Sequence, residues 1–145
     1  MIGFNRRFAP QIVKIKELLK NMSSSKSFLL TVNAGSIDKT HWVQDRNIGG
    51  GRVIGEVCHF VDLLRFLSDS KIREVSSIYM NSDTRDTLSI NISFDDGSIG
   101  SICYFANGGK KFKKERLEIF CDNGVLQLDN FQRLKGYNWP GFSKM

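Results

Sequence analysis

The stretch that decides the fold is TLSINISFDDGSIGSICYF, Thr87 to Phe105. Its apolar residues recur with a period of two, which is typical of β-strands that bury one face. Asp96-Gly97 interrupts the pattern, and Asp-Gly between two such segments is a strong signal for a β-hairpin. Since hairpins join antiparallel strands, the stretch predicts two adjacent antiparallel strands.

The same pattern continues on both sides of this hairpin. Asn123-Gly124 gives a second hairpin signal further along the chain. The other expected strands are residues 1–5, 28–33, 75–80, 116–121, 125–130 and 131–137. Most of these strands are close in sequence, which predicts a mainly antiparallel sheet.

Two segments show helical periodicity instead. Ala9 to Met22 carries apolar residues at helical spacing, with Pro10 placed for a first turn. Gly51 to Ser68 is apolar almost all round, which is typical of a buried helix. Helices followed by a meander of strands predict an α+β fold, an open and mainly antiparallel β-sheet with helices packed on one face. At 145 residues, the chain suits a single domain over residues 1–145.

The composition narrows the class of protein. With 41% hydrophobic and 25% charged residues, the chain is expected to be globular. No apolar run reaches the roughly 18 residues of a membrane span, and the first residues lack the features of a signal peptide. We therefore expect a cytoplasmic protein with no membrane partner, whose cysteines are reduced.

The net charge of +6 leaves several partners open. The basic run from Lys110 to Arg116 suits a solvated loop, an anionic small substrate or a nucleic acid. It lacks a recognised nucleic-acid motif and a basic helix with aromatic platforms, so we expect no nucleic-acid partner.

The glycines before the second helix invite comparison with nucleotide-binding loops. Gly49, Gly51 and Gly55 have the spacing G-x-G-x-x-x-G, one residue longer than a dinucleotide fingerprint, and no parallel β-α-β context surrounds them. No G-K-[ST] occurs, which excludes a P-loop. We expect no cofactor-binding residues in this chain.

Three polar residues share one face of the second helix. At about 100° per residue, Glu56 and His59 fall within about 40° of Arg52. Charged groups on a buried helix need partners or a cavity, so this polar stripe is a candidate pocket wall. His59 could act as a general acid or base, or it could be a core histidine held by Glu56. No cluster of His and Cys has metal-ligand spacing, so no metal is expected.

The long segment between residues 34 and 51 is a candidate binding loop. The loop suits a polar, ring-shaped ligand, because the indole of Trp42 can stack while Lys39, His41 and Gln44 form hydrogen bonds. An ordinary surface loop is the alternative.

Together these segments resemble the C-terminal domain of the Gfo/Idh/MocA family of NAD(P)-dependent oxidoreductases, over nearly the whole chain. One branch of this family is fused to zinc-type-dehydrogenase-like segments in polysaccharide loci. This branch is the most similar to the sequence segments NRRFAP, HW and GEVCHFVDL. The resemblance implies that His59 is the catalytic proton shuttle. Many family members have an aspartate four residues earlier, where this chain has Gly55, and Asp62 matches a later acidic position with a structural role.

The resemblance also implies what this chain lacks. The family's Rossmann domain and its Glu-Lys-Pro segment are absent, so the domain is expected to be truncated at both ends and inactive alone. NAD or NADP would bind the full-length enzyme, or a Rossmann-domain partner chain. The implied function is substrate binding and oligomerisation in an oxidoreductase of sugar metabolism or polysaccharide biosynthesis, acting on a secondary alcohol of a sugar or nucleotide sugar. Lys39, His41, Arg52 and Glu56 would orient the sugar, and subunits would pair through the sheet. The alternative is a non-enzymatic, homo-oligomerising remnant or assembly module.

Overall fold

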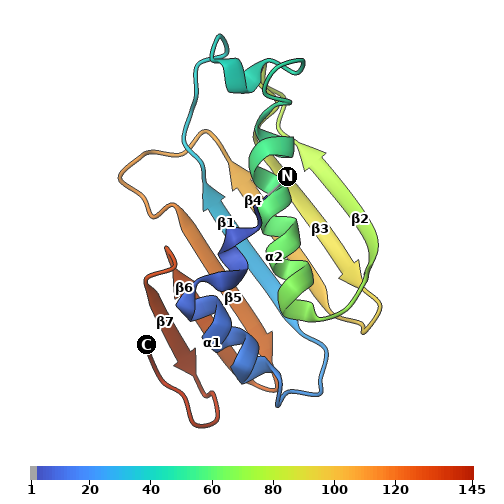
Figure 1. Ribbon diagram of the computed structural model, residues 1–145, viewed down its shortest axis with the longest axis vertical. Coiled ribbons are helices and arrows are strands. Elements are labelled where there is room, and N and C mark those ends of the chain that lie inside the picture. The colour runs from blue at the N-terminus through green and yellow to red at the C-terminus, as the bar shows by residue number, and fades with distance from the viewer. Residues whose placement is uncertain (1–2) are drawn as a thin grey trace.

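A curved, seven-stranded β-sheet dominates residues 3–145, the part of the chain that this computed structural model describes (Figure 1). Across the sheet, the strands are ordered β2-β3-β4-β1-β5-β6-β7. All neighbours are antiparallel except β1 and β4, which run parallel. The expected mainly antiparallel sheet is thereby confirmed. The strands are β1 (Ser27–Asn33), β2 (Ile72–Tyr79), β3 (Leu88–Phe94), β4 (Ile99–Phe105), β5 (Glu115–Cys121), β6 (Gly124–Asp129) and β7 (Arg133–Tyr137).

Both hairpin signals mark real turns. Gly97 lies between β3 and β4 with a φ of +83°, a conformation that glycine adopts without steric cost. Asp122 and Asn123 join β5 to β6 with φ values of +48° and +63°, and Asp and Asn tolerate this left-handed region better than most residues. The local turn chemistry therefore fixes these two antiparallel pairs.

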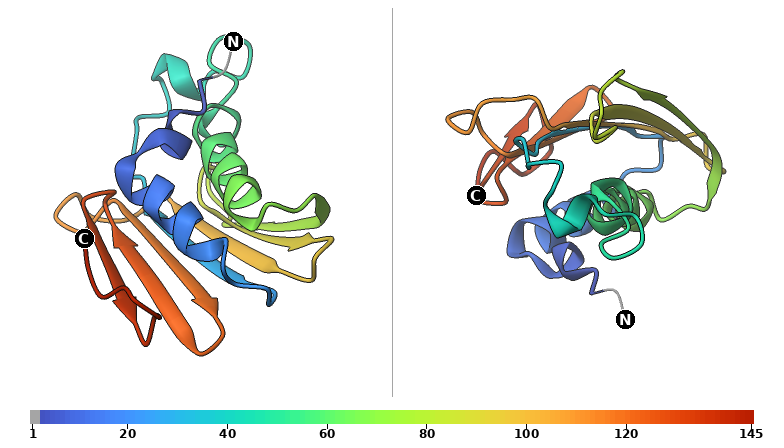
Figure 2. Two further views of the ribbon diagram at one scale, coloured as in Figure 1. Left: turned by 60° about the horizontal axis from the view of Figure 1, so that its bottom comes forward. Right: turned by 90° about the horizontal axis from the view of Figure 1, so that it is seen from above.

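Helices α1 (Pro10–Leu19) and α2 (Cys58–Ser68) cover one face of the sheet (Figure 2). The buried side chains of each helix pack against the inward-facing residues of the strands. Inward-facing and outward-facing residues alternate along the strands, as the period of two in the sequence predicts. The helical part of the core is Ile12, Ile15, Leu19, Phe60, Leu63, Leu64 and Leu67. Burial of these side chains is the main stabilising contribution to the two-layer fold.

Some element boundaries differ from those expected. The strand expected at residues 1–5 is absent from residues 3–5, where Asn5 begins the 3-10 helix η1 (Asn5–Phe8), while residues 1–2 lie outside the described part. Helix α1 ends at Leu19 rather than Met22. The expected helix at 51–68 begins with a π-helical segment, η3 (Val53–Val57), before α2. Single π-turns are frequent at functional sites.

The segment before α1 is fixed to α2 and the sheet by two arginines. The Arg7 guanidinium forms a two-point ion pair with Asp62 of α2. Asp62, for which the resemblance implies a structural role, thus binds Arg7 of the N-terminal segment. Arg6 lies 4.4 Å from the ring centroid of Phe60 and donates to Glu115 at 3.0 Å. These contacts hold the N-terminal segment across the start of α2.

Three loops leave the sheet at the end where the α2 segment begins. They follow β1, β2 and β4, which run in the same direction. The loop after β1 spans residues 34–51 and contains the 3-10 helix η2 (Trp42–Gln44), and the loop after β2 spans residues 80–87. This end of the sheet gathers the polar residues described below.

The other face of the sheet carries no helix within residues 3–145 (Figure 2). Ile99, Phe105 and Phe120 point outward from this face and are exposed. None of the helices in residues 3–145 is both long enough and apolar enough to cross a membrane.

Candidate functional site

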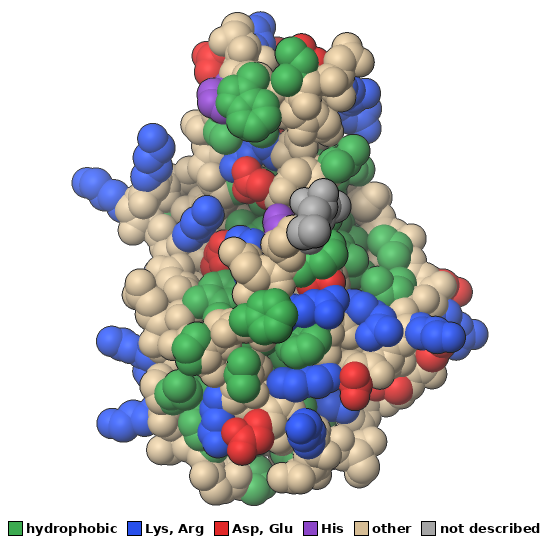
Figure 3. Space-filling model, viewed as in Figure 1, with side chains coloured by type: hydrophobic (Ala, Val, Ile, Leu, Met, Phe, Trp, Pro, Cys, Tyr) green, Lys and Arg blue, Asp and Glu red, His purple; other side chains and the backbone are tan. Residues whose placement is uncertain are grey.

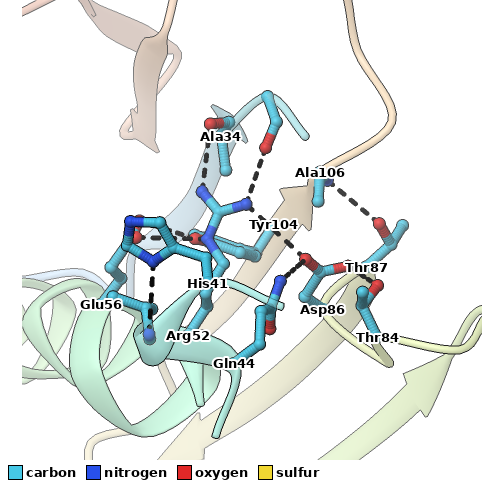
Figure 4. Close-up of polar contacts among 12 residues, drawn as sticks. Ala34, His41, Gln44, Arg52, Glu56, Thr84, Asp86, Thr87, Tyr104 and Ala106 are labelled. Atoms are coloured by element: carbon cyan, nitrogen blue, oxygen red, sulfur yellow. Dashed lines mark hydrogen bonds and ion pairs between the residues drawn. The ribbon is translucent and has the colours of Figure 1, made fainter. Parts of the chain in front are cut away.

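Arg52, at the start of the η3–α2 segment, connects three parts of the chain. Its side chain is only 2% exposed. Nη1 and Nη2 donate to the carbonyl oxygens of Gly35 and Ala34 at 2.6 and 3.0 Å, and Nε donates to Glu56 at 3.2 Å (Figure 4). Nη1 also lies 3.6 Å from the Asp86 carboxylate. Arg52 therefore fixes the beginning of the 34–51 loop against the helix and against the 80–87 loop.

Asp86 is the acidic partner on the far side of this guanidinium. Its buried carboxylate accepts hydrogen bonds from Gln44 Nε2 at 3.1 Å and from Thr84 Oγ1 at 2.6 Å (Figure 4). Because Gln44 belongs to the 34–51 loop and Thr84 to the 80–87 loop, the carboxylate holds the two loops together.

Glu56 is fixed through both carboxylate oxygens. Oε1 accepts from Arg52, and Oε2 accepts from the Tyr104 hydroxyl at 2.6 Å. Tyr104 is fully buried on β4. Burial raises the pKa of its phenol, and so does the hydrogen bond to the Glu56 carboxylate. Tyr104 therefore remains a neutral donor that orients Glu56.

His59 lies one helical turn beyond Glu56. Its Nδ1 atom is buried and has no hydrogen-bond partner within residues 3–145. Its ring packs edge-on against Phe4, with ring centroids 5.6 Å apart. Within residues 3–145 no hydrogen bond joins His59 to Glu56, whose oxygens are bonded to Arg52 and Tyr104. Buried polar atoms without partners are uncommon in native structures, and each requires an explanation.

Gly55 occupies the position where the resemblance described above leads us to expect an aspartate. A Cβ atom there would meet nothing within 4 Å, so packing does not require glycine. The position belongs to the π-helical segment, whose i→i+5 turns place side chains at different angles from those of an α-helix. The carboxylate in this turn is that of Glu56.

Lys39, His41 and Trp42 lie on the exposed part of the 34–51 loop, which extends beyond the sheet (Figure 1). Trp42 is 61% exposed, and its ring lies 5.8 Å from that of His41. Nδ1 of His41 accepts the backbone N–H of Val43 at 3.3 Å. The structure thus brings Arg52 and Glu56 together but leaves these three residues on a separate projection. Figure 3 shows two histidine patches on this side of the molecule, with acidic and basic side chains between them.

The glycines before the helix serve loop packing. A Cβ on Gly49 would lie 2.7 Å from the Trp42 carbonyl oxygen and from Val43 Cα, so only glycine allows this close approach. The connection from β1 through α2 to β2 joins parallel strands, but β3 and β4 lie between these strands in the sheet, unlike the adjacent strands of a dinucleotide-binding unit. These residues do not fit a dinucleotide cofactor. Within residues 3–145, no three His, Cys, Asp or Glu side chains converge as metal ligands.

Tyr104 and Asp86 are site residues that the sequence did not single out. Tyr104 carried a usable signal, because a tyrosine at an inward position of a predicted strand needs a partner for its hydroxyl. Asp86 carried no such signal, since it is one of several polar residues in a loop and its partners Arg52 and Gln44 are 34 and 42 residues away in sequence.

Comparison with known proteins finds one consistent set of relatives. The sequence profile of the GFO/IDH/MocA C-terminal domain matches residues 24–127. An uncharacterized oxidoreductase of Bacillus subtilis (strain 168), YrbE, is 24% identical over 137 residues, which cover 89% of this chain and 40% of the relative.

Solved structures show the same fold. An oxidoreductase domain protein from Kribbella flavida superimposes with a TM-score of 0.82 at 20% identity, covering 100% of this chain and 47% of that one. Levoglucosan dehydrogenase, solved with NADH and levoglucosan, gives a TM-score of 0.82 at 19% identity, covering 100% of this chain and 46% of that one. The chain therefore spans less than half the length of these relatives.

Proposed function

The chain belongs to the Gfo/Idh/MocA family of oxidoreductases, as its C-terminal domain, and on this premise we propose that it is the substrate-binding half of an enzyme acting on a secondary alcohol of a sugar or nucleotide sugar. A cofactor-binding half outside the 145 residues would complete that enzyme. The partner half would bind NAD or NADP, since the glycines of this chain do not fit a dinucleotide.

The observation that carries the proposal is that the His59 side chain makes no hydrogen bond within residues 3–145, whereas the neighbouring polar groups on the stripe are bonded to each other. Because its Nδ1 is buried, a substrate hydroxyl would meet the other ring nitrogen, Nε2. A neutral imidazole nitrogen donates or accepts according to its tautomer.

The contribution of this chain to the chemistry is proton transfer. His59 accepts the proton of the substrate hydroxyl during oxidation and returns it in the reverse direction. Glu56, one helical turn before His59, accepts a hydrogen bond from a neighbouring sugar hydroxyl. Lys39, His41 and Trp42 lie on the separate projection of the 34–51 loop, and they would contact the sugar if that loop moves toward His59, where the indole offers a stacking surface.

Arg52 has a supporting role in this proposal. Its donors are already engaged by Ala34, Gly35 and Glu56. It therefore orients the Glu56 carboxylate rather than contacting the sugar.

The solved neighbour that binds levoglucosan supports a sugar as the substrate class. This support is a likeness of fold, and the substrate of the present chain follows from its own polar groups. A histidine and a carboxylate one helical turn apart suit a ligand with several hydroxyl groups.

The bare face of the sheet favours a second role in assembly. Ile99, Phe105 and Phe120 are 57%, 37% and 44% exposed on it. Covering this face with a second copy would remove apolar surface from water. Sedimentation equilibrium tests this role: we expect a dimer that an Ile99→Lys/Phe120→Lys variant converts to monomer, and a monomeric wild type would contradict it.

Sugar binding can be measured on this chain by NMR, because it has only two histidines. Levoglucosan, glucose and UDP-glucose are added to protein labelled with carbon-13 at histidine, and His59→Gln assigns the two ring signals. We expect one of these ligands to shift the His59 signal saturably and His59→Gln to weaken its binding. Gln132→Ala, an exposed substitution between β6 and β7, should leave binding unchanged. If none of the ligands shifts the His59 signal, the proposed role is wrong.

A further inference from the structure

A second pocket lies on the Asp86 side of Arg52, away from Glu56. It has a volume of about 510 Å³ and opens between the 34–51 loop and the 80–87 loop. Gln44 and Arg46 line it from the first loop, and Thr84 and Arg85 line it from the second. Arg52 and Asp86 also line it and join the loops there. The proposed chemistry at His59 makes no use of this pocket.

The pocket carries uncompensated positive charge. Arg46 and Arg85 have no ion pair within residues 3–145, although both are exposed at the rim. The acidic residue in the lining, Asp86, is already bonded to Arg52, Gln44 and Thr84. Two arginines from different loops therefore line one cavity, and neither guanidinium has a hydrogen-bond partner within residues 3–145.

Arg85 is held in an unusual conformation. Its φ is +48°, a left-handed value that is uncommon for residues other than glycine. Its backbone N–H donates to the Ser82 hydroxyl at 3.2 Å, and its guanidinium lies 5.3 Å from the ring centroid of Tyr79. The turn and the aromatic ring together fix a side chain that would otherwise be free in solvent. Such local strain is a reason to look for function.

We propose that this pocket binds an oxyanion, the phosphate or carboxylate group of a small molecule. Arg46 and Arg85 would bind it from opposite loops, because the planar guanidinium matches both groups in two-point geometry. The cavity is larger than a single oxyanion needs, so the group belongs to a larger ligand. This site is separate from the sugar pocket, and its existence does not depend on the proposed reaction.

Binding here would act on the sugar pocket through Arg52. The anion would connect the 34–51 and 80–87 loops, which Asp86 already holds together. Arg52 lines the anion pocket and also donates to Glu56 at 3.2 Å. An anion that draws the loops together therefore stabilises the arrangement that orients Glu56.

Titration of the chain with small anions tests the proposal directly. Inorganic phosphate, glucose 6-phosphate, glucuronate and glucose are added separately, and the side-chain Nε–Hε signals of Arg46 and Arg85 are followed by NMR. We expect saturable shifts with at least one phosphate or carboxylate ligand and none with glucose, and the binding should weaken as salt increases. The glucose 6-phosphate and glucuronate titrations show which oxyanion is preferred.

Two variants locate the site. Arg46→Gln/Arg85→Gln should weaken the binding at least about tenfold, equivalent to about 1.4 kcal/mol. The control Arg73→Gln/Arg133→Gln removes the same charge from exposed positions on β2 and β7 and should leave the affinity within about twofold. Arg46→Gln alone provides the test if the double variant does not fold.

Three results would overturn the proposal. They are the absence of saturable binding by every anion, an equal loss in both double variants, and an unchanged affinity in the Arg46→Gln variant. An equal loss would mean that the anions respond to net charge alone. Glucose shifts at His59 belong to the sugar site, so failure of one site can be distinguished from failure of the other.

Discussion

Replacing Tyr104 with phenylalanine removes one hydrogen bond and leaves the packing in place. The hydroxyl donates to Glu56 at 2.6 Å, and the Arg52 guanidinium carbon lies 5.4 Å from the ring centroid. A hydrogen bond to a charged group contributes about 1.5–3 kcal/mol. The Glu56 side chain is 36% exposed, so water can replace the hydroxyl in part. We therefore expect Tyr104→Phe to lower the free energy of unfolding by about 1–2 kcal/mol.

The same substitution should change the response to alkaline pH. Burial and the bond to Glu56 raise the pKa of Tyr104 above the ordinary value near 10. Above that pH, the unfolded chain loses the phenolic proton while the folded chain keeps it, so stability falls by up to about 1.4 kcal/mol per pH unit. Tyr104→Phe should remove this contribution to the fall of the unfolding free energy with pH.

Urea unfolding between pH 7 and 11 measures both effects. Tyr137→Phe is the matched control, because Tyr137 is 47% exposed and should change the stability by less than about 0.5 kcal/mol. The melting temperature of Tyr104→Phe should fall by roughly 3–6 °C at pH 7. A variant as stable as the wild type, or with the same alkaline slope, would refute the role given to the Tyr104 hydroxyl.

Three further substitutions test the site and the fold. Arg52→Ala should cost about 3–5 kcal/mol in urea unfolding, because it leaves a buried carboxylate without its cation, whereas the exposed control Arg73→Ala should cost less than about 0.5 kcal/mol. Gly55→Ala should raise the stability by about 0.5–1 kcal/mol, because the new Cβ meets open space; a loss would show that the π-helical turn requires glycine. Burial alone would raise the pKa of Asp129, but its basic neighbours, including Lys113, lower that pKa overall. The ionised carboxylate therefore stabilises the fold above about pH 4, and this stabilisation is lost as the pH falls below that value. Lys113→Gln should reduce that acid-dependent loss in thermal melts, and an unchanged profile would contradict the pairing.

The sequence predicts the parts of this fold that depend on local chemistry. Asp96-Gly97 and Asn123-Gly124 specify their turns directly, and alternation identifies the strands beside them. The parallel pairing of β1 with β4 joins Ser27 to Ile99, 72 residues apart, and no local signal encodes it. Such a pairing follows from how the helices and hairpins pack around a shared core.

The candidate site shows the same difference between local signals and contacts of distant residues. Arg52, Glu56 and His59 share one helix, so their common face could be read from periodicity. Their partners Tyr104 and Asp86 lie on other elements, and only the assembled sheet brings them near. The π-helical turn was also hidden, because the apolar pattern from residues 51 to 68 is equally compatible with a regular helix.

The role of His59 as the proton acceptor of an oxidoreductase is most directly tested in a completed enzyme. The chain can be fused to the part of levoglucosan dehydrogenase that it does not cover, since that enzyme was solved with NADH. Nicotinamide reduction is then followed at 340 nm with a panel of sugars and nucleotide sugars. We predict turnover with at least one of them, and a loss of about 10²–10⁴-fold in kcat for His59→Asn, the usual contribution of a general acid or base. Equal turnover by the parent fusion and the His59→Asn variant would contradict the assignment.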